Sequence, residues 1–284
     1  MANTIADRVY RDKYRSAMLE KILRNNLTAE AICEVDRSDN KRIQNPYGSQ
    51  PSASVQAISG HYITDDYVTT DDTLTVDNEV IVSEHIFDFE EVLTHFNMFS
   101  SRTEEMVYSV ANRIDRFVLN NLCEDATGAY TTPVGGFTDP VNIIEILSNL
   151  LSKVAGYSDV YKGLFLVLEN TDITGFAESQ AKSGFSFADG ALRNGFYDSQ
   201  MGIDIYVVRT GTFADETLGT TSYTNSGHRV FGVKNVSTYA SPRGIRWEEK
   251  SVSGKTGKEI VVWGYIGFKL WFTKTALVVD ITLA

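Results

Sequence analysis

A short glycine-containing stretch near the C-terminus is a candidate phosphate site. Gly254-Lys255-Thr256 matches the end of a phosphate-binding loop, in which the lysine contacts phosphate and the threonine hydroxyl contacts Mg²⁺. Such a loop needs a glycine five residues before its second glycine, and that position is Glu249. It also needs a helix afterwards, whereas Lys258–Val262 has the pattern of a strand. We therefore predict that Ser253–Gly257 is a turn between two strands.

Serine and cysteine are the candidate nucleophiles. Gly156–Val160 lacks the final glycine of a nucleophile elbow, so Ser158 is better interpreted as a turn residue after a helix. The two cysteines, Cys33 and Cys123, each lie in an apolar helical pattern. Buried cysteines of this kind behave as small apolar side chains. We predict two reduced, buried thiols and no covalent catalysis.

Metal chemistry would need clustered ligands. The Asp65-Asp66 and Asp71-Asp72 pairs do not fit a calcium-binding EF-hand loop, and no cysteine spacing fits zinc. None of the histidines has a partner at helical metal-ligand spacing. The histidines are His61, His85, His95 and His228. We predict no catalytic residue, cofactor or metal, and a protein that is not an enzyme; an enzyme would need a pocket of convergent titratable groups.

One segment near the N-terminus has the composition of a nucleic-acid contact. It is basic, with Tyr10 and Tyr14 interleaved, but the whole chain has a formal net charge of -11, which argues against gripping phosphates. We predict that it binds acidic residues on a neighbouring copy, with contact to nucleic acid as the alternative. Its basic residues are Arg8, Arg11, Lys13, Arg15, Lys21 and Arg24.

The composition predicts a globular protein. With 284 residues, 43% of them hydrophobic, the chain can form one large domain or two small ones. The N-terminus has no apolar signal region. The most apolar stretch, Ile260–Leu283, is interrupted by Lys269, Lys274 and Asp280 and reads as strands rather than a membrane span. We expect a protein that is made in the cytoplasm and does not contact a membrane.

An acidic hairpin is predicted over residues 53–86, as two long strands joined at Asp71-Asp72. No lysine or arginine occurs between Arg42 and Arg102. An isolated hairpin is marginal in water, and like charges across its strands destabilise it further. We therefore expect something outside the hairpin to bury its apolar side and neutralise its acids.

A long helix is predicted over residues 89–123, followed by an α/β unit over residues 126–212. The helix has an apolar face at three- and four-residue steps, including Met106, Val110, Ile114 and Phe117. Charged residues are expected on its other face. These are Arg102, Glu105, Arg113, Asp115 and Arg116.

The α/β unit should contain two buried strands and two helices, and the second helix is expected to begin at Thr171 or Asp172. Asp139-Pro140 has the pattern of a helix start. The apolar face expected for this helix consists of Ile143, Ile144, Leu147, Leu150, Leu151 and Val154. Leu164–Leu168 and Ile203–Val208 have the continuous apolar pattern of buried strands. Residues 214–227 are predicted to be a polar loop, and strands return from His228 onward.

This order of parts resembles that of the major capsid proteins of tailed bacteriophages, which have the Hong Kong 97-type fold. Local patterns similar to that family's are Gly190–Phe196, Met201–Val208, Gly232-Val233, Arg246–Glu249 and Tyr265–Leu270. The resemblance implies an α+β fold with an N-terminal arm, an extended E-loop hairpin, a long spine helix, an axial domain and a peripheral β-sheet. The implied boundaries are 1–50 for the arm, 51–88 for the E-loop hairpin, 89–125 with 228–284 for the peripheral domain, and 126–227 for the axial domain.

The resemblance also implies a function. The chain would self-assemble into pentamers and hexamers of an icosahedral phage head in the host bacterial cytoplasm. Its partners would be itself, a portal, a scaffold, decoration proteins, and packaged double-stranded DNA on the inner face, bound without sequence specificity. The alternative is an encapsulin-like compartment that encloses a cargo enzyme. Expected inter-subunit contacts pair acids with bases: Asp65, Asp66, Asp71 and Asp72 with Arg11, Arg15, Arg243, Arg246, Lys250 and Lys258.

Overall fold

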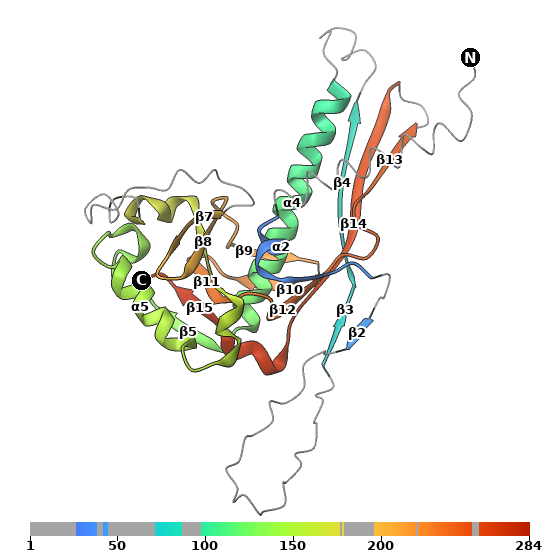
Figure 1. The fold of residues 1–284 in the computed structure, drawn as a ribbon. Helices are drawn as coiled ribbons and strands as arrows, with labels where there is room; N and C mark the ends of the chain where they lie inside the picture. Colours follow the sequence, from blue (N-terminus) through green and yellow to red (C-terminus); the bar gives the residue numbers. More distant parts are fainter. Residues whose placement is uncertain are drawn as a thin grey trace, which may run out of the picture.

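The computed structural model describes most of the chain (Figure 1). The predicted first strand of the hairpin and the expected helix start at residues 89–97 lie outside the described residues. The described residues are 27–38, 42–44, 72–86, 98–176, 178, 196–219, 221–251 and 256–284.

A six-stranded sheet has the order β5-β15-β11-β6-β8-β7. Its central strand β6 is buried along its whole length, and it runs parallel to β8, so both predicted buried strands are confirmed. The strands are β5 Gly128–Thr131, β6 Leu164–Glu169, β7 Phe196–Gln200, β8 Ile203–Val208, β11 His228–Val233 and β15 Val278–Thr282.

Helix α5 (Ile143–Val154) carries a buried apolar face, as predicted, but it begins later than expected. Asp139 does not cap it. Instead, the Asp139 carboxylate accepts the N–H of Val141 (3.0 Å), so Asp139-Pro140 forms a turn before the helix. Ile144, assigned to the apolar face, is 64% exposed. The short 3-10 helices are η1 Gly136–Thr138, η2 Ser158–Lys162, η3 Asn170–Asp172 and η4 Phe272–Leu277.

A second sheet is organised around one long strand, β14. This strand pairs antiparallel with β13, β4 and β12, and β12 pairs parallel with β1. The two strands predicted on either side of the Ser253–Gly257 turn are confirmed, because β13 and β14 pair with Ser251 opposite Lys258. The strands are β1 Glu34–Asp36, β4 Asn78–Ile86, β12 Ser237–Ala240, β13 Arg246–Ser251 and β14 Lys258–Leu270.

The acidic strand β4 has a partner near the C-terminus of the chain. It pairs with β14 over nine positions, from Ile86 opposite Lys258 to Asn78 opposite Ile266. Its apolar side is therefore buried within its own chain. The short strand before it, β3 (Thr73–Thr75), pairs with β2 (Arg42–Gln44). Residues 214–227, predicted as a loop, form the hairpin of β9 (Asp215–Leu218) and β10 (Thr221–Thr224).

Residues 228–284 contribute strands to both sheets rather than to a single peripheral sheet. β11 and β15 join the six-stranded sheet, whereas β12, β13 and β14 join the other. Val278, Val279 and Ile281 of β15 are fully buried in the six-stranded sheet, where β15 lies between β11 and β5.

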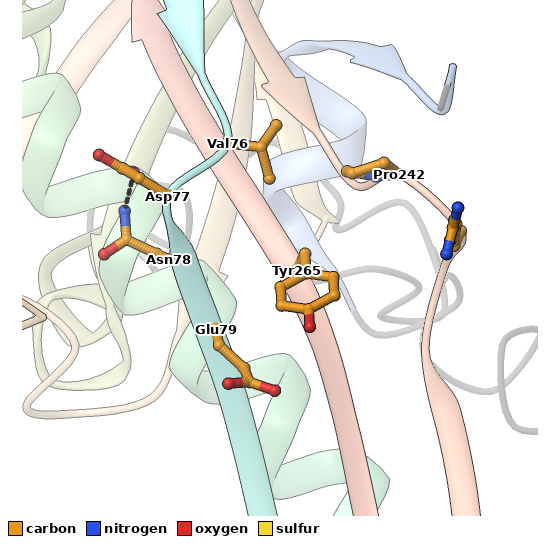
Figure 2. Close-up of a pocket in the computed structure, with 7 residues that line it drawn as sticks. Val76, Asp77, Asn78, Glu79, Pro242 and Tyr265 are labelled. Carbon is orange, nitrogen blue, oxygen red and sulfur yellow. Dashed lines mark hydrogen bonds between the residues drawn. The ribbon is translucent and has the colours of Figure 1, made fainter. Parts of the chain in front are cut away.

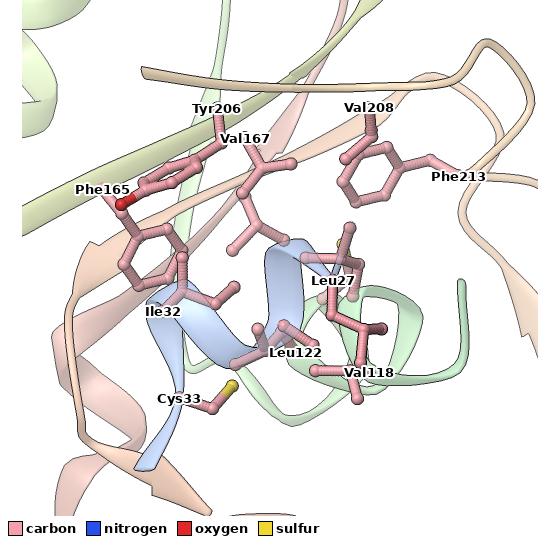
Figure 3. Packing of buried hydrophobic residues seen from close by; sticks show 14 of the residues in the cluster. Leu27, Ile32, Cys33, Val118, Leu122, Phe165, Val167, Tyr206, Val208 and Phe213 are labelled. Atoms are coloured by element: carbon pink, nitrogen blue, oxygen red, sulfur yellow. The ribbon is translucent and has the colours of Figure 1, made fainter. Parts of the chain in front are cut away.

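Helix α4 (Met98–Asp125) lies against β4, β14 and the six-stranded sheet, and its predicted apolar face is confirmed as buried. Asp115, assigned to the solvent face, is buried. The reason is that a short helix, α2 (Thr28–Ile32), packs on that side of α4. Figure 3 shows Leu27 of this segment near Val118 of α4, and Ile32 near Phe165 of β6, within one buried cluster.

A buried ionic cluster joins β6, η3 and β11. Arg229 donates to Asp172 (Nε to Oδ2, 2.5 Å) and to Glu169 (Nη2 to Oε2, 3.2 Å). The other oxygen of Glu169 accepts the N–H groups of Gly211 (2.9 Å) and Phe213 (3.1 Å). All three charged side chains are at most 8% exposed. Removing one member would leave the opposite charge buried without a partner.

We expect Arg229→Ala to lower the free energy of unfolding by about 3–5 kcal/mol, because two carboxylates would stay buried without their cation. Chemical denaturation of the purified chain measures this change. Lys258→Ala is the control, because the Lys258–Glu249 pair (2.6 Å) involves a lysine that is 57% exposed, and it should cost about 1 kcal/mol or less. Equal costs for the two variants would contradict a structural role for the buried cluster.

Candidate intersubunit contact surfaces

The face of the second sheet that points away from α4 carries an unusual set of exposed side chains. Glu84 of β4 forms an ion pair with Arg102 of α4, so the neighbouring odd positions of β4 point to the opposite side. Arg246, Trp263 and Ile81 lie directly across from one another on β13, β14 and β4. We call this side of the sheet the outward sheet face.

The side chains of the outward sheet face contact one another. The Arg246 guanidinium lies 5.4 Å from the centre of the Trp263 ring, within the range of a cation–π interaction. Trp263 and Tyr265 make an edge-to-face contact with ring centroids 5.4 Å apart. Ile81 is 57% exposed and Tyr265 is 43% exposed. Arginine and large aromatic residues are the types enriched at the centres of protein–protein interfaces.

A groove of about 440 Å³ continues this face where β4 begins (Figure 2). Tyr265 lies between the β4 side, with Glu79, and the turn that carries Pro242. Asn78 donates to the Asp77 carboxylate (2.6 Å) at one edge. The lining residues are Val76, Asp77, Asn78, Glu79, Pro242, Arg243 and Tyr265. The lining of the groove therefore combines apolar, polar and charged side chains.

Arg243 reaches the groove from a strained turn. Gly244 donates its N–H to the Ser241 carbonyl (3.3 Å), which closes a four-residue turn with Pro242 at its second position. The third position, Arg243, has φ 66°, a conformation that favours glycine. Such strain persists at contact sites when the side chain has a use that glycine could not serve.

A second exposed surface comprises residues 133–144, which lead into α5 and include its first two residues. We call it the apolar turn. Val134 is 86% exposed, Val141 77% and Ile144 64%. The turn is rigid: the Asn142 amide donates to the Val134 carbonyl (3.0 Å), and the Asp139 N–H donates to the Gly135 carbonyl (3.2 Å). Exposed apolar groups on a pre-organised backbone are typical of binding surfaces.

The basic residues predicted as contacts gather on the second sheet. Arg246 and Lys250 lie on β13, Lys258 begins β14, and Arg243 lines the groove. Two of them have intrachain partners, because Lys250 pairs with Glu248 (3.1 Å) and Lys258 with Glu249 (2.6 Å). Their pairing with acids of another copy stays a prediction.

Of the acids predicted as contacts, the structure describes Asp72. It accepts the N–H of Phe272 (2.9 Å) and pairs with Lys269 (3.2 Å), so it fastens β3 to the end of β14. The remaining predicted contact residues lie outside the described residues. They are Asp65, Asp66, Asp71, Arg11 and Arg15.

The thiols have the environment that the sequence predicted. Cys33 and Cys123 are unpaired and buried. Burial raises the pKa of Cys33 to about 12 and raises the pKa of Cys123 well above its usual value, so neither thiol is activated as a nucleophile. Within the described residues, no group of His, Cys, Asp and Glu is arranged to hold a metal ion.

Sequence reasoning missed Ile81, Trp263, Tyr265 and the exposed valines of the apolar turn. A partial signal was present, because Trp263 and Tyr265 occupy alternating positions of one strand and Ile81 shares alternating strand positions with the polar residues Glu79 and Ser83. Among the helices that the structure describes, none has both the length and the apolar character needed to span a bilayer.

No protein-family model and no curated protein matches this sequence. Solved structures do match it. The capsid of the cyanophage P-SCSP1u is 12% identical, with a TM-score of 0.67, over 89% of this chain and 86% of that chain. A structure from Mycobacterium phage Che8 is 16% identical, with a TM-score of 0.62, over 85% and 84% of the two chains.

A virus-like particle from Pyrococcus furiosus is also similar in structure. It is 10% identical, with a TM-score of 0.61, over 96% of this chain and 99% of that chain. Together these matches confirm the predicted α+β fold of the Hong Kong 97 type, shared with tailed-phage capsid proteins. At these identities the likeness is one of fold.

We expect Arg243→Gly to be more stable than Arg243→Ala by about 1 kcal/mol, because glycine adopts positive φ without steric cost, whereas alanine does not. Both variants remove the same side-chain contacts, so their difference isolates the backbone strain. Denaturant unfolding of the two chains measures it. Equal stability would show that the turn stores no strain.

Proposed function

We propose that this chain is a structural shell protein that forms the pentamers and hexamers of an icosahedral phage head enclosing double-stranded DNA. The supporting observation is the likeness in fold to the cyanophage P-SCSP1u capsid over nearly nine-tenths of both chains. A shared fold does not by itself fix function, so the surfaces of this chain must carry the rest.

Those surfaces suit repeated self-association. The outward sheet face presents an arginine, two aromatic rings and an isoleucine on one rigid sheet, and the apolar turn presents three aliphatic side chains on a rigid backbone. A symmetric shell uses the same contact many times, so modest burial at each copy accumulates. Charged pairs at the rims would contribute mainly to register and to rejection of wrong partners.

A second candidate is the shell of a compartment that encloses a cargo enzyme. The observation that favours it is the match to the virus-like particle from Pyrococcus furiosus over nearly the full length of both chains. The two candidates share self-assembly and differ in what the particle contains. Nucleic acid in purified particles would support the phage head, and a co-purified enzyme would support the compartment.

The deciding experiment is electron microscopy of the chain expressed alone, together with its mass in solution. Closed shells, tubes, or rings of five and six subunits support a shell protein of either kind. A chain that stays monomeric or dimeric, even with candidate scaffold proteins added, would contradict both candidates.

We expect Val141→Asp combined with Val134→Asp to abolish or strongly reduce assembly while the subunit stays folded. Both side chains are mostly exposed in the single chain, so the charges cost little there, but an apolar contact would bury them without a partner. Particle yield by sedimentation and subunit stability by thermal unfolding measure the two effects. Ser148→Asp, on an exposed position of α5, is the matched control and should assemble normally.

We also expect the combined substitutions Asp65→Lys, Asp66→Lys and Asp71→Lys to impair assembly without unfolding the subunit. The reason is that these acids are proposed to face basic residues of another copy. Asp72 is left unchanged, since it binds Phe272 and Lys269 within the chain. The control replaces the same three residues with asparagine, which removes charge without reversing it. Normal particle yield from the lysine variant would eliminate the electrostatic part of the proposal.

A further inference from the structure

The N-terminal end of the described chain is inserted into the core. Residues 27–36 comprise Leu27, helix α2 and strand β1, and we call them the inserted segment. Leu27, Ala29 and Ile32 are at most 1% exposed. The segment is also tied by backbone bonds, since Asn235 donates to the Ile32 carbonyl (2.8 Å) and β1 pairs with β12. It directly follows residues 1–26 in the sequence.

One carboxylate from α4 holds the start of this segment. Asp115 accepts the N–H of Ala29 at Oδ1 (2.9 Å) and the N–H of Thr28 at Oδ2 (3.1 Å). These amides open helix α2, which has no side-chain cap of its own from Leu27. Asp115 therefore performs, from another helix, the role that a capping residue usually performs locally.

The carboxylate of Asp115 is buried among groups that do not neutralise it. The titratable side chains that act on it, or that it acts on, are Glu30 on α2, the Cys33 thiol and the Tyr239 phenol on β12. Arg37, a basic group that acts on Tyr239, pairs with Glu30 (2.8 Å). Within the described residues, Asp115 has no ion-pair partner. A buried carboxylate without a cation is costly when ionised.

Burial is the largest influence on Asp115 and raises its pKa from 3.8 to about 7. The bonds from Ala29 and Thr28 act in the opposite direction, and the negative charge of Glu30 adds to the rise. Desolvation thus outweighs the two backbone bonds, so the buried site holds a proton more tightly than the same carboxyl does in water.

We propose that Asp115 makes insertion of residues 27–36 proton-dependent: the segment is held most firmly when Asp115 carries a proton and is released more easily when Asp115 is ionised. The device concerns the single chain and does not rest on the proposed function. Its consequence is that the attachment of the basic residues 1–26 to the body of the protein varies with pH near neutrality.

The direction follows from proton linkage. Withdrawal of the segment returns Asp115 to water, where its pKa is 3.8, whereas the inserted state has a pKa of about 7. The inserted state therefore binds more protons between these values. The contribution of Asp115 protonation to the stability of the inserted state is fully present below about pH 4 and is lost as the pH rises through about 7.

Cys33 reports withdrawal of the segment. It is buried and free and lies directly after α2, where its sulfur accepts the Ser237 hydroxyl (3.1 Å). Alkylation of the full chain with iodoacetamide, followed by peptide mass spectrometry, gives its rate, and an unstructured cysteine-containing peptide in the same reaction gives a reference rate. The ratio of the two rates cancels the ordinary pH dependence of thiol reactivity, because the reference thiol is always exposed.

In the wild-type chain, the ratio of Cys33 alkylation to that of the reference peptide should increase at least about tenfold between pH 5 and pH 7. Asp115→Asn keeps the shape and removes the ionisation, so its ratio should not vary with pH. A flat wild-type ratio, or an equal increase in Asp115→Asn, would overturn the proposal.

A second variant keeps the test valid if Asp115→Asn does not fold. Glu30→Gln removes a negative charge that raises the pKa of Asp115, so the wild-type increase should shift to lower pH. Glu145→Gln, on the exposed side of α5, is the matched control and should leave the profile unchanged. A Glu30→Gln profile identical to wild type would also overturn the proposal.

Discussion

Helix α4 must be buried on several sides at once, and the rest of the architecture serves that requirement. Its apolar positions are too widely spread around the helix for one sheet to cover. β4 and β14 cover one side, the six-stranded sheet receives the C-terminal half, and the inserted segment covers the side that contains Asp115. Each layer is anchored to another part of the chain, so loss of any one would expose apolar surface on α4.

Close packing around α4 also determines where polar groups can stay. Asp115 is buried because α2 needs a cap and α4 supplies it, and the resulting carboxylate lies in an environment that favours its neutral form. The buried acids Glu169 and Asp172 differ from Asp115, because Arg229 lies between them and neutralises their charge. One buried acid is thus responsive to pH, whereas the paired acids are held as a structural unit.

The two exposed surfaces described above share one property. The outward sheet face and the apolar turn both display apolar or aromatic side chains on backbone that is well fixed by hydrogen bonds. Rigid elements lose little entropy on association, which suits contacts that are repeated by symmetry. Arg243, which lines the groove, has a left-handed backbone conformation that is unfavourable for a residue other than glycine.

Periodicity in the sequence alone determined the helices and strands, because burial on one face leaves a local pattern: the apolar face of α4, the strands β6 and β8, and the β13–β14 hairpin were all predictable. The order of parts also indicated the fold. Tertiary structure alone decided which strands pair, since no local pattern specifies that β4 joins β14 about 180 residues later. It likewise decided the environments of Asp72 and Asp115, because a charged residue reads as solvent-exposed until the segment that covers it is known.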